Sequence, residues 1–171
     1  LDVEPDGTVN PQKLEEAIRD DTILISIMLV NNEVGTVEPV EALSAIAKKH
    51  GILFHTDGVQ ALGNVPIDVK KMGVDMMSLS AHKIYGPKGV GALYVRKGLR
   101  ISNYLYGGAQ EAGRRAGTEN LAGIVGFGKA AQLAEKNFER HVSHCREMRD
   151  YLIERITSEI PDVFVNGSMK H

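Results

Sequence analysis

Three short segments of the sequence place polar side chains directly after apolar runs. The segments are NNEVG (31–35), HTDGVQ (55–60) and SAHK (80–83). In open α/β sheets, ligands bind just beyond the carboxyl ends of the strands, so these segments are expected to meet at one edge. Together they offer groups that can accept protons, donate hydrogen bonds or attack as nucleophiles: Asn31, Asn32, Asp57, Gln60, Ser80, His82 and Lys83.

Each of these residues also has an ordinary structural role when it is considered alone. Asp57 could close a turn with Gly58, and Asn31 or Asn32 could cap a loop. Lys83 could be a solvated surface amine. The coincidence of three strand ends, rather than any single residue, favours a functional site.

The combination of a lysine with an aspartate fits pyridoxal phosphate. That cofactor needs a lysine amine for a Schiff base and a carboxylate against its pyridine nitrogen. Hydroxyl groups and an imidazole can donate hydrogen bonds to its phosphate. We therefore predict pyridoxal 5'-phosphate as cofactor, with Lys83 and Asp57 facing one ring from successive strand ends.

The segment GPKGVG (86–91) is not a nucleotide-binding P-loop. Such a loop needs Ser or Thr after its lysine and a helix next. Here Gly89 follows Lys88, and the strand-like GALYV comes next. The glycines are expected to let the backbone turn tightly before that strand.

Length and composition restrict the possible classes of protein. The chain has 171 residues, a net charge of −2 and a pI of about 6.3, so no general affinity for nucleic acid or anionic membranes is expected. No segment approaches the ~20 apolar residues that span a bilayer. The single cysteine suits a reducing compartment, and we expect a cytoplasmic protein. Because the sequence opens on LDVEPDG, without a starting Met or a signal peptide, we expect a piece of a longer chain.

The elements that would position these residues alternate between strands and helices. Asn10 and Pro11 signal the start of a helix, and a second helix over 39–51 ends on basic residues and Gly51. The unbroken apolar run 22–30 predicts a strand covered on both faces. Further strands are expected over 52–57, 74–80 and 91–95. This order predicts an α/β fold with a mostly parallel sheet flanked by helices.

The last third of the sequence is expected to leave this domain. A helical pattern runs from Asn120 to Ile160, and a strand is predicted over 163–167. We expect a partial cofactor-binding large domain over 1–130, and a long connecting helix with the start of a small domain over 131–171. One apolar stripe of the helix comprises Phe138, Val142, Cys145, Met148, Leu152 and Ile156.

The motifs resemble the cysteine desulfurases, in the class V aminotransferase group of fold-type-I pyridoxal-phosphate enzymes. The matching segments are VNNEVGTVEPV, HTDGVQALGNVPIDV, VDMMSLSAHKIYGPKGVGALYVRKG and GGAQEAGRRAGTEN, in that order. The resemblance extends from about Leu1 to Ile160. It implies the large-domain fold of these enzymes and conversion of L-cysteine to L-alanine. Sulfur would pass to an enzyme persulfide for iron–sulfur cluster assembly or another sulfur carrier.

The resemblance also implies a role for each site residue. Lys83 would form the Schiff base and move protons, and Asp57 would pair with the pyridine nitrogen. Gln60 and Asn32 would approach the phenolic oxygen of the ring, a role for which Asn31 is less suited. Ser80 and His82 would hold the phosphate. Thr118 would reach the phosphate of the partner subunit in a homodimer.

Other parts of the family's site have no counterpart in this sequence. These parts are a Gly/Thr-rich phosphate loop, a ring-stacking aromatic residue, a substrate-binding arginine and the catalytic cysteine. Cys145 is expected to be buried on the helix stripe and inert. Arg114 and Arg115 are expected to serve the dimer contact. We therefore expect the chain alone to be inactive.

Two alternatives to a desulfurase are open at this point. A selenocysteine lyase or an aminotransferase would use the same cofactor residues, although GGAQEAGRRAGTEN favours a desulfurase. A non-catalytic α/β interaction domain would bind no cofactor. No metal site is expected.

Overall fold

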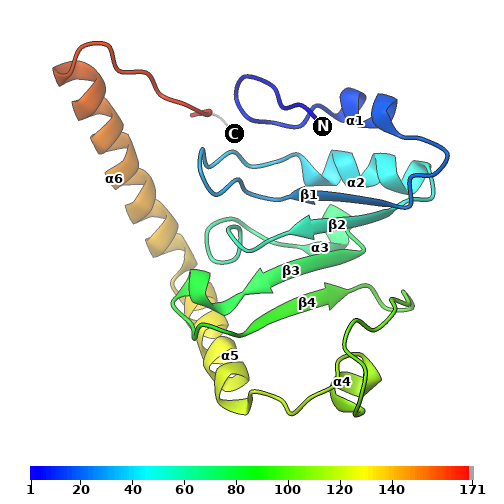
Figure 1. Ribbon diagram of the computed structural model, residues 1–171. Helices are drawn as coiled ribbons and strands as arrows, with labels where there is room; N and C mark the ends of the chain where they lie inside the picture. Colours follow the sequence, from blue (N-terminus) through cyan, green and yellow to red (C-terminus); the bar gives the residue numbers. More distant parts are fainter. Residues whose placement is uncertain (170–171) are drawn as a thin grey trace.

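A four-stranded sheet forms the centre of the computed structural model, which describes residues 1–169 (Figure 1). The strands lie in the order β1-β2-β3-β4, with β1, β2 and β3 parallel and β4 antiparallel to β3. The predicted α/β class with a mostly parallel sheet is thus confirmed. The strand bounds are β1 Leu24–Met28, β2 Leu53–Asp57, β3 Met76–Ser80 and β4 Gly91–Val95.

Helices α1 (Pro11–Ala17), α2 (Val40–Lys49) and α3 (Val69–Met72) accompany the first half of the sheet. Helix α1 begins as predicted, because Asn10 Oδ1 accepts hydrogen bonds from the backbone N–H groups of Gln12 and Lys13. Helix α2 packs against β2, α1 and α3. The core between α2 and the sheet includes Leu43, Phe54, Val74 and Met77.

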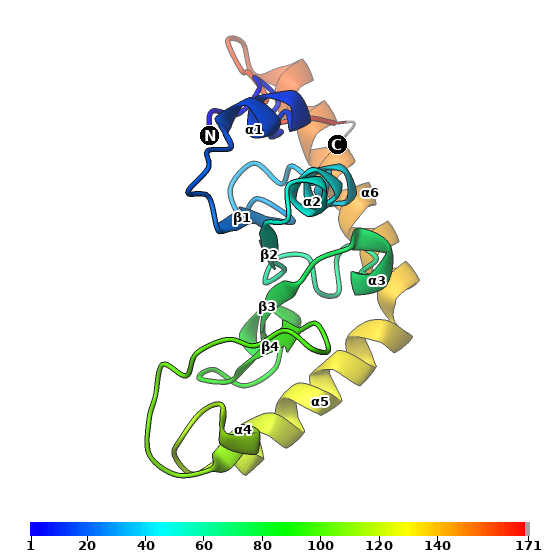
Figure 2. The same cartoon turned by 90° about the vertical axis from the view of Figure 1, so that its right-hand side faces the viewer.

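The helices cover only one face of the sheet. In Figure 2, α2, α3 and α5 lie on the same side of the strands. The expectation that strand 22–30 is covered on both faces is wrong, since buried and exposed residues alternate along β1. Ile25 is buried, whereas Leu24 is 46% exposed and Ile23 is 81% exposed. Among residues 1–169, no helix covers the second face, and the run 22–30 leaves Ile23, Leu24 and Ser26 exposed.

A tight turn precedes β4, as the glycine-rich segment predicts. Gly89 has a φ of 78°, in the left-handed region that favours glycine. At Gly91, a Cβ atom would lie 2.6 Å from the carbonyl oxygen of Leu79. The close approach of β4 to β3 therefore requires a residue without a side chain.

The predicted helix over 120–160 is present but divided. Helix α5 (Leu121–Lys136) and helix α6 (Phe138–Glu159) meet at Asn137, which has non-helical backbone angles. A short element, α4 (Gln110–Gly113), precedes them. Neither Gly nor Pro lies beside Asn137 to signal this interruption.

Two expectations about the end of the chain are wrong. No strand forms over 163–167, since no neighbouring strand pairs with this segment among the described residues. Helix α6 contains no buried residue, and Cys145 is exposed rather than buried. Its apolar stripe is only partly covered within residues 1–169: Phe138, Val142 and Ile156 are half-buried, whereas Leu152 is 58% exposed. None of the described helices is long and apolar enough to cross a membrane.

Candidate cofactor site

The parallel strands bring two of the predicted segments to the same edge. Asp57 is the last residue of β2 and pairs in register with Met28 of β1 and Ser78 of β3. Ser80 ends β3, and a 3₁₀ helix, η1 (Ala81–Ile84), follows at once. The carboxyl ends of β1, β2 and β3 therefore lie together, as expected for a ligand site in an open sheet.

Asp57 is held firmly while part of its carboxylate stays available. Its Oδ1 accepts a 2.8 Å hydrogen bond from the backbone N–H of Val59. Its backbone carbonyl accepts a 2.8 Å bond from the N–H of Leu29 in the preceding strand. Among the described residues, Oδ2 receives no hydrogen bond. This oxygen can accept one from a protonated ring nitrogen.

The η1 turn projects His82 and Lys83 outward. Ala81 and Ile84 are buried and anchor the turn in the core, while the two residues between them are exposed. Ser80 Oγ lies 2.7 Å from His82 Nδ1, which orients the imidazole at the end of β3. Lys83 forms no ion pair among residues 1–169. Its amine is free for covalent chemistry.

The two neighbouring asparagines have different surroundings. Asn31 Oδ1 accepts hydrogen bonds from the backbone N–H groups of Glu33 and Val34, at 2.9 and 3.0 Å. This asparagine closes the loop after β1. The side chain of Asn32 makes no such bond within the described part of the chain and is the freer of the two for a ligand.

Gln60 and Thr118 occupy different places. Gln60 follows the end of β2, and its backbone carbonyl accepts a 2.9 Å hydrogen bond from Asn64 Nδ2. Thr118 belongs to the connection between α4 and α5, and these two helices lie beyond the β4 edge of the sheet in Figure 1. Its carbonyl accepts a 3.5 Å bond from Arg115. The fold thus separates Thr118 from Asp57 within one chain.

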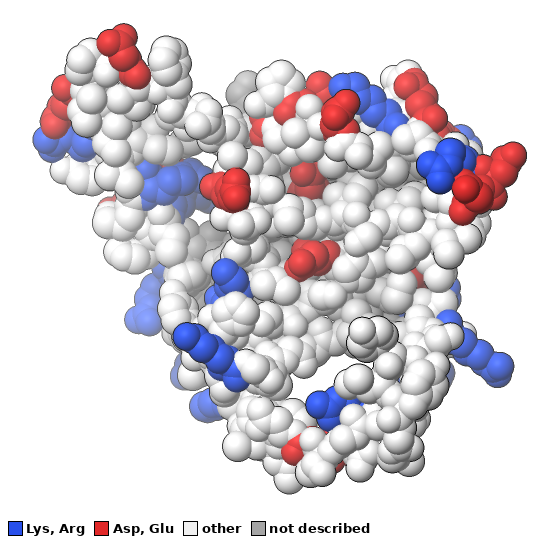
Figure 3. Space-filling model, viewed as in Figure 1, with Lys and Arg blue, Asp and Glu red and all other residues white. Residues whose placement is uncertain are grey.

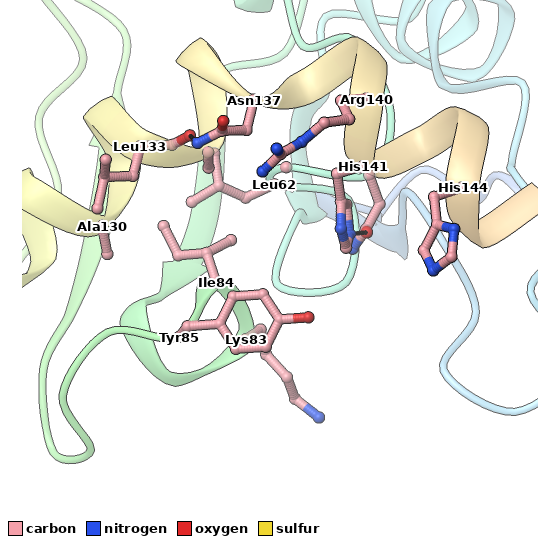
Figure 4. Close-up of a pocket in the computed structure, with 13 residues that line it drawn as sticks. Leu62, Lys83, Ile84, Tyr85, Ala130, Leu133, Asn137, Arg140, His141 and His144 are labelled. Atoms are coloured by element: carbon pink, nitrogen blue, oxygen red, sulfur yellow. Dashed lines mark hydrogen bonds between the residues drawn. The ribbon is translucent and has the colours of Figure 1, made fainter.

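A pocket of about 580 Å³ lies between the η1 turn and the junction of α5 with α6 (Figure 4). Of the predicted site residues, only Lys83 lines it, together with Tyr85, Arg140, His141 and others. In Figure 4 the Lys83 side chain extends away from the helix that carries Arg140 and His141. The pocket does not gather Asp57, Gln60, Ser80 and His82, and the joint role of these residues stays a prediction.

The charges around the site are of both signs. On the face seen in Figure 3, acidic and basic side chains are interspersed, without one large basic area. No cluster of three or more His, Cys, Asp and Glu side chains that could hold a metal ion occurs in the described residues.

One polar side chain of the sheet, His55, was not among the predicted site residues. His55 lies two residues before Asp57 on β2, and both of its ring nitrogens have hydroxyl partners, Ser26 and Ser78. The strand period of two, which puts His55 and Asp57 on the same face, could have indicated it.

These residues fit pyridoxal phosphate. Asp57 Oδ2 can accept a hydrogen bond from the ring nitrogen, and the Lys83 amine forms no ion pair among residues 1–169. The Ser80–His82 pair supplies hydrogen-bond donors at the end of β3. The set therefore contains a carboxylate, an amine and phosphate ligands of the required kinds.

Comparison with known proteins defines the class. The family model for aminotransferase class-V matches residues 1–171, and the chain belongs to this family. Within it, the chain matches the cysteine desulfurases, as the motifs indicated. These homologues depend on pyridoxal phosphate, in agreement with the predicted cofactor.

Individual relatives support this placement. The chain is 53% identical to cysteine desulfurase IscS of Dictyoglomus turgidum, over 98% of this chain and 42% of that protein. It is 55% identical to IscS of Methanosarcina thermophila, over 98% of this chain and 41% of that protein. The chain thus spans about two fifths of the length of these relatives.

Solved structures agree with the fold. A NifS-like protein superimposes with a TM-score of 0.88 at 42% identity, over 91% of this chain and 43% of that chain. SspA in complex with cysteine superimposes with a TM-score of 0.74 at 48% identity, over 76% of this chain and 38% of that chain.

Proposed function

We propose that this chain supplies the cofactor-binding residues of a pyridoxal-phosphate-dependent cysteine desulfurase. The reaction converts L-cysteine to L-alanine and transfers the sulfur to an enzyme cysteine as a persulfide. The observation that carries the proposal is the identity of 53–55% with cysteine desulfurases over nearly the whole chain. The edge of the sheet that presents Asp57, Ser80 and His82 supports it.

The bound cofactor would act as an electron sink for the substrate's α-carbon. Asp57 would hold the proton on the ring nitrogen through its free Oδ2, while Val59 fixes Oδ1. Lys83 would attach the cofactor and then carry protons to and from the substrate carbon. Gln60 and Asn32 would donate hydrogen bonds from their amides to the phenolic oxygen of the ring.

Phosphate binding would fall to Ser80 and His82. Their side chains already contact one another, so little ordering is needed when an anion binds. Thr118 would contact the phosphate of a partner subunit, since it lies away from Asp57 in its own chain. Exposed aromatic side chains on the same β4–α5 connection, Tyr104 and Tyr106, are suited to a homodimer contact.

We propose a division into a partial large domain over residues 1–130 and the connection to a small domain over 131–171. The partner of the reaction would be an iron–sulfur scaffold or another sulfur acceptor. We place the activity in the cytoplasm on the basis of the single cysteine, although one relative is named a mitochondrial cysteine desulfurase.

Cys145 stays outside this mechanism. Cys145 is exposed, so burial does not make it inert. It lies on α6, where its Sγ is 3.8 Å from His141 Nε2. The resemblance places the sulfur-accepting cysteine outside this sequence.

Absorbance spectroscopy tests the proposal. Pyridoxal phosphate added to the chain should form a Schiff-base band that Lys83→Ala abolishes. A complete enzyme that forms no such band at any cofactor concentration would instead point to a non-catalytic domain. Alanine production from cysteine by the complete enzyme then separates a desulfurase from an aminotransferase, and selenocysteine as competing substrate separates it from a selenocysteine lyase.

A further inference from the structure

A chain of three polar side chains crosses the first three strands on the face that no described helix covers. Ser26 Oγ lies 2.8 Å from His55 Nδ1, and His55 Nε2 lies 2.8 Å from Ser78 Oγ. Ser26 belongs to β1, His55 to β2 and Ser78 to β3. The imidazole is therefore held at both ring nitrogens and bridges β1 and β3, the strands on either side of β2.

This hydrogen-bonded chain has a direction. In a neutral imidazole one ring nitrogen donates and the other accepts, so one serine must donate to the ring while the other accepts from it. Apolar residues such as Leu24, Leu53 and Met76 occupy the same face. A polar bridge among them fixes the relative position of the strands more specifically than apolar contacts can.

The series of hydrogen bonds from Ser26 through His55 to Ser78 ends beside Asp57. His55 and Asp57 are two residues apart on β2, so their side chains share a face. Ser78 is the register partner of Asp57 on β3. The backbone carbonyl of Ser78 also accepts a 2.9 Å hydrogen bond from the N–H of Gly58, the residue that follows Asp57. The Ser78 hydroxyl group is thus held by His55, and the Ser78 backbone carbonyl holds the turn that follows Asp57.

We propose that His55, acting through Ser78, is a positioning residue for Asp57. It sets the separation of β2 and β3 where the carboxylate must meet the pyridine nitrogen, and it does not itself touch the reacting atoms. The inference rests on the proposed function. Functional side chains must be held within ~0.5 Å of their productive geometry, which requires a second set of residues to hold them.

Two variants and one control test this role. His55→Leu removes both hydrogen bonds, and His55→Gln keeps an amide that can reach Ser78. His50→Gln is the control, because His50 contacts Glu15 beyond the end of α2, away from the bridge.

The first measurement uses the cofactor-free chain. Amide hydrogen exchange, followed by NMR, reports on the Gly58 N–H donated to Ser78 and the Val59 N–H donated to Asp57. In His55→Leu both amides should exchange faster, on the order of tenfold. The Phe54 amide, which donates to Asp75, should not change. His55→Gln should restore most of the protection.

The second measurement is titration with pyridoxal phosphate, followed by absorbance. His55→Leu should weaken cofactor binding about tenfold, His55→Gln less, and His50→Gln not at all. The same titration is made with the complete enzyme, because parts of the family's site have no counterpart in this sequence. If that enzyme binds no cofactor, the proposed function fails, and hydrogen exchange alone decides the positioning role.

Two results would overturn the inference. One is unchanged exchange at Gly58 and Val59 in a folded His55→Leu chain. The other is faster exchange at Phe54 to the same degree, which would make His55 a general stabilising residue. Should His55→Leu fail to fold, Ser78→Ala removes only the hydroxyl group and must give the same pattern.

Discussion

The hydroxyl oxygen of Ser80 lies 2.7 Å from Nδ1 of His82, across the junction between β3 and η1. This contact orients the imidazole at the end of a strand. The second ring nitrogen, Nε2, takes no part in the contact. The pair is a preformed group of hydrogen-bond donors rather than two independent surface residues. It leads directly to an expectation about the cofactor's phosphate.

Ser80→Ala should weaken the binding of pyridoxal phosphate by about tenfold or more, because hydrogen bonds to charged groups contribute about 1.5–3 kcal/mol. Titration with pyridoxal, which lacks the phosphate, provides the control. Its affinity should be the same for the variant and the unaltered chain. Equal losses of affinity for pyridoxal phosphate and for pyridoxal would show that Ser80 does not contact the phosphate.

Lys83→Ala should abolish the Schiff-base band while leaving the melting temperature unchanged, since the exposed side chain contributes little to the core. Lys88→Ala is a matched control, because Lys88 is also exposed but lies in the glycine-rich turn. A band that survives in Lys83→Ala would assign the covalent role to another amine. In the complete enzyme, the same variant should eliminate turnover.

Asp57→Asn should lower turnover of the complete enzyme severely, by several orders of magnitude, because a neutral amide cannot hold the ring nitrogen protonated. The amide oxygen can still accept the hydrogen bond from Val59, so the turn should persist. Circular dichroism should therefore show an unchanged fold. Near-normal rates of alanine formation would contradict the assignment of Asp57.

Cys145 should react readily with a thiol reagent in the native chain, because it is exposed on α6. Cys145→Ala should change the free energy of unfolding by less than about 0.5 kcal/mol, the usual range for a surface position. Slow alkylation, at the rate of global unfolding, would show that an association between chains covers this helix. Urea titration measures the stability difference.

Glu38 should make the stability depend on pH. Burial raises the pKa of its carboxyl above the ordinary value, although the backbone N–H of Val9 donates to it at 2.7 Å and opposes the shift. The folded state then holds the proton more tightly than the unfolded state. The contribution of Glu38 to the free energy of unfolding is greatest below pH 4.5, the ordinary pKa of a glutamate. It is lost as the pH rises through the raised pKa of the folded state.

Glu38→Gln should remove this contribution. The difference in free energy of unfolding between the two chains should therefore change with pH across that window and become constant above it. Urea unfolding at a series of pH values measures the difference. The comparison cancels the contributions of Glu4, Glu15 and Asp68 to the pH dependence, whose lowered pKa values act in the opposite direction. A difference that is constant with pH would refute the prediction.

The local elements were predictable because their signals lie within a few residues. Asn10 and Pro11 start α1 as expected, and Gly51 follows α2 with a φ of 70°. The strands β2, β3 and β4 occur where the apolar runs end at polar segments. Parallel pairing then places Asp57 and Ser80 at one edge, since parallel strands all end on the same side.

Burial was less predictable, because it depends on what packs against an element. The apolar run of β1 and the stripe of α6 suggested two covered surfaces, yet Leu24 and Leu152 are exposed. Apolar character shows that a residue is suited to burial, but a partner must be present to bury it. Cys145 was misjudged for the same reason.

The sequence by itself determined the family and its cofactor, because these follow from motifs in a fixed order, and it predicted the site residues Asp57, Ser80, His82 and Lys83. Only the tertiary structure decided which hydrogen bonds support them. The bridge from Ser26 through His55 to Ser78 joins residues 29 and 23 positions apart in the chain. Strand register creates such contacts, and register is set by the packing of the whole sheet rather than by any local pattern.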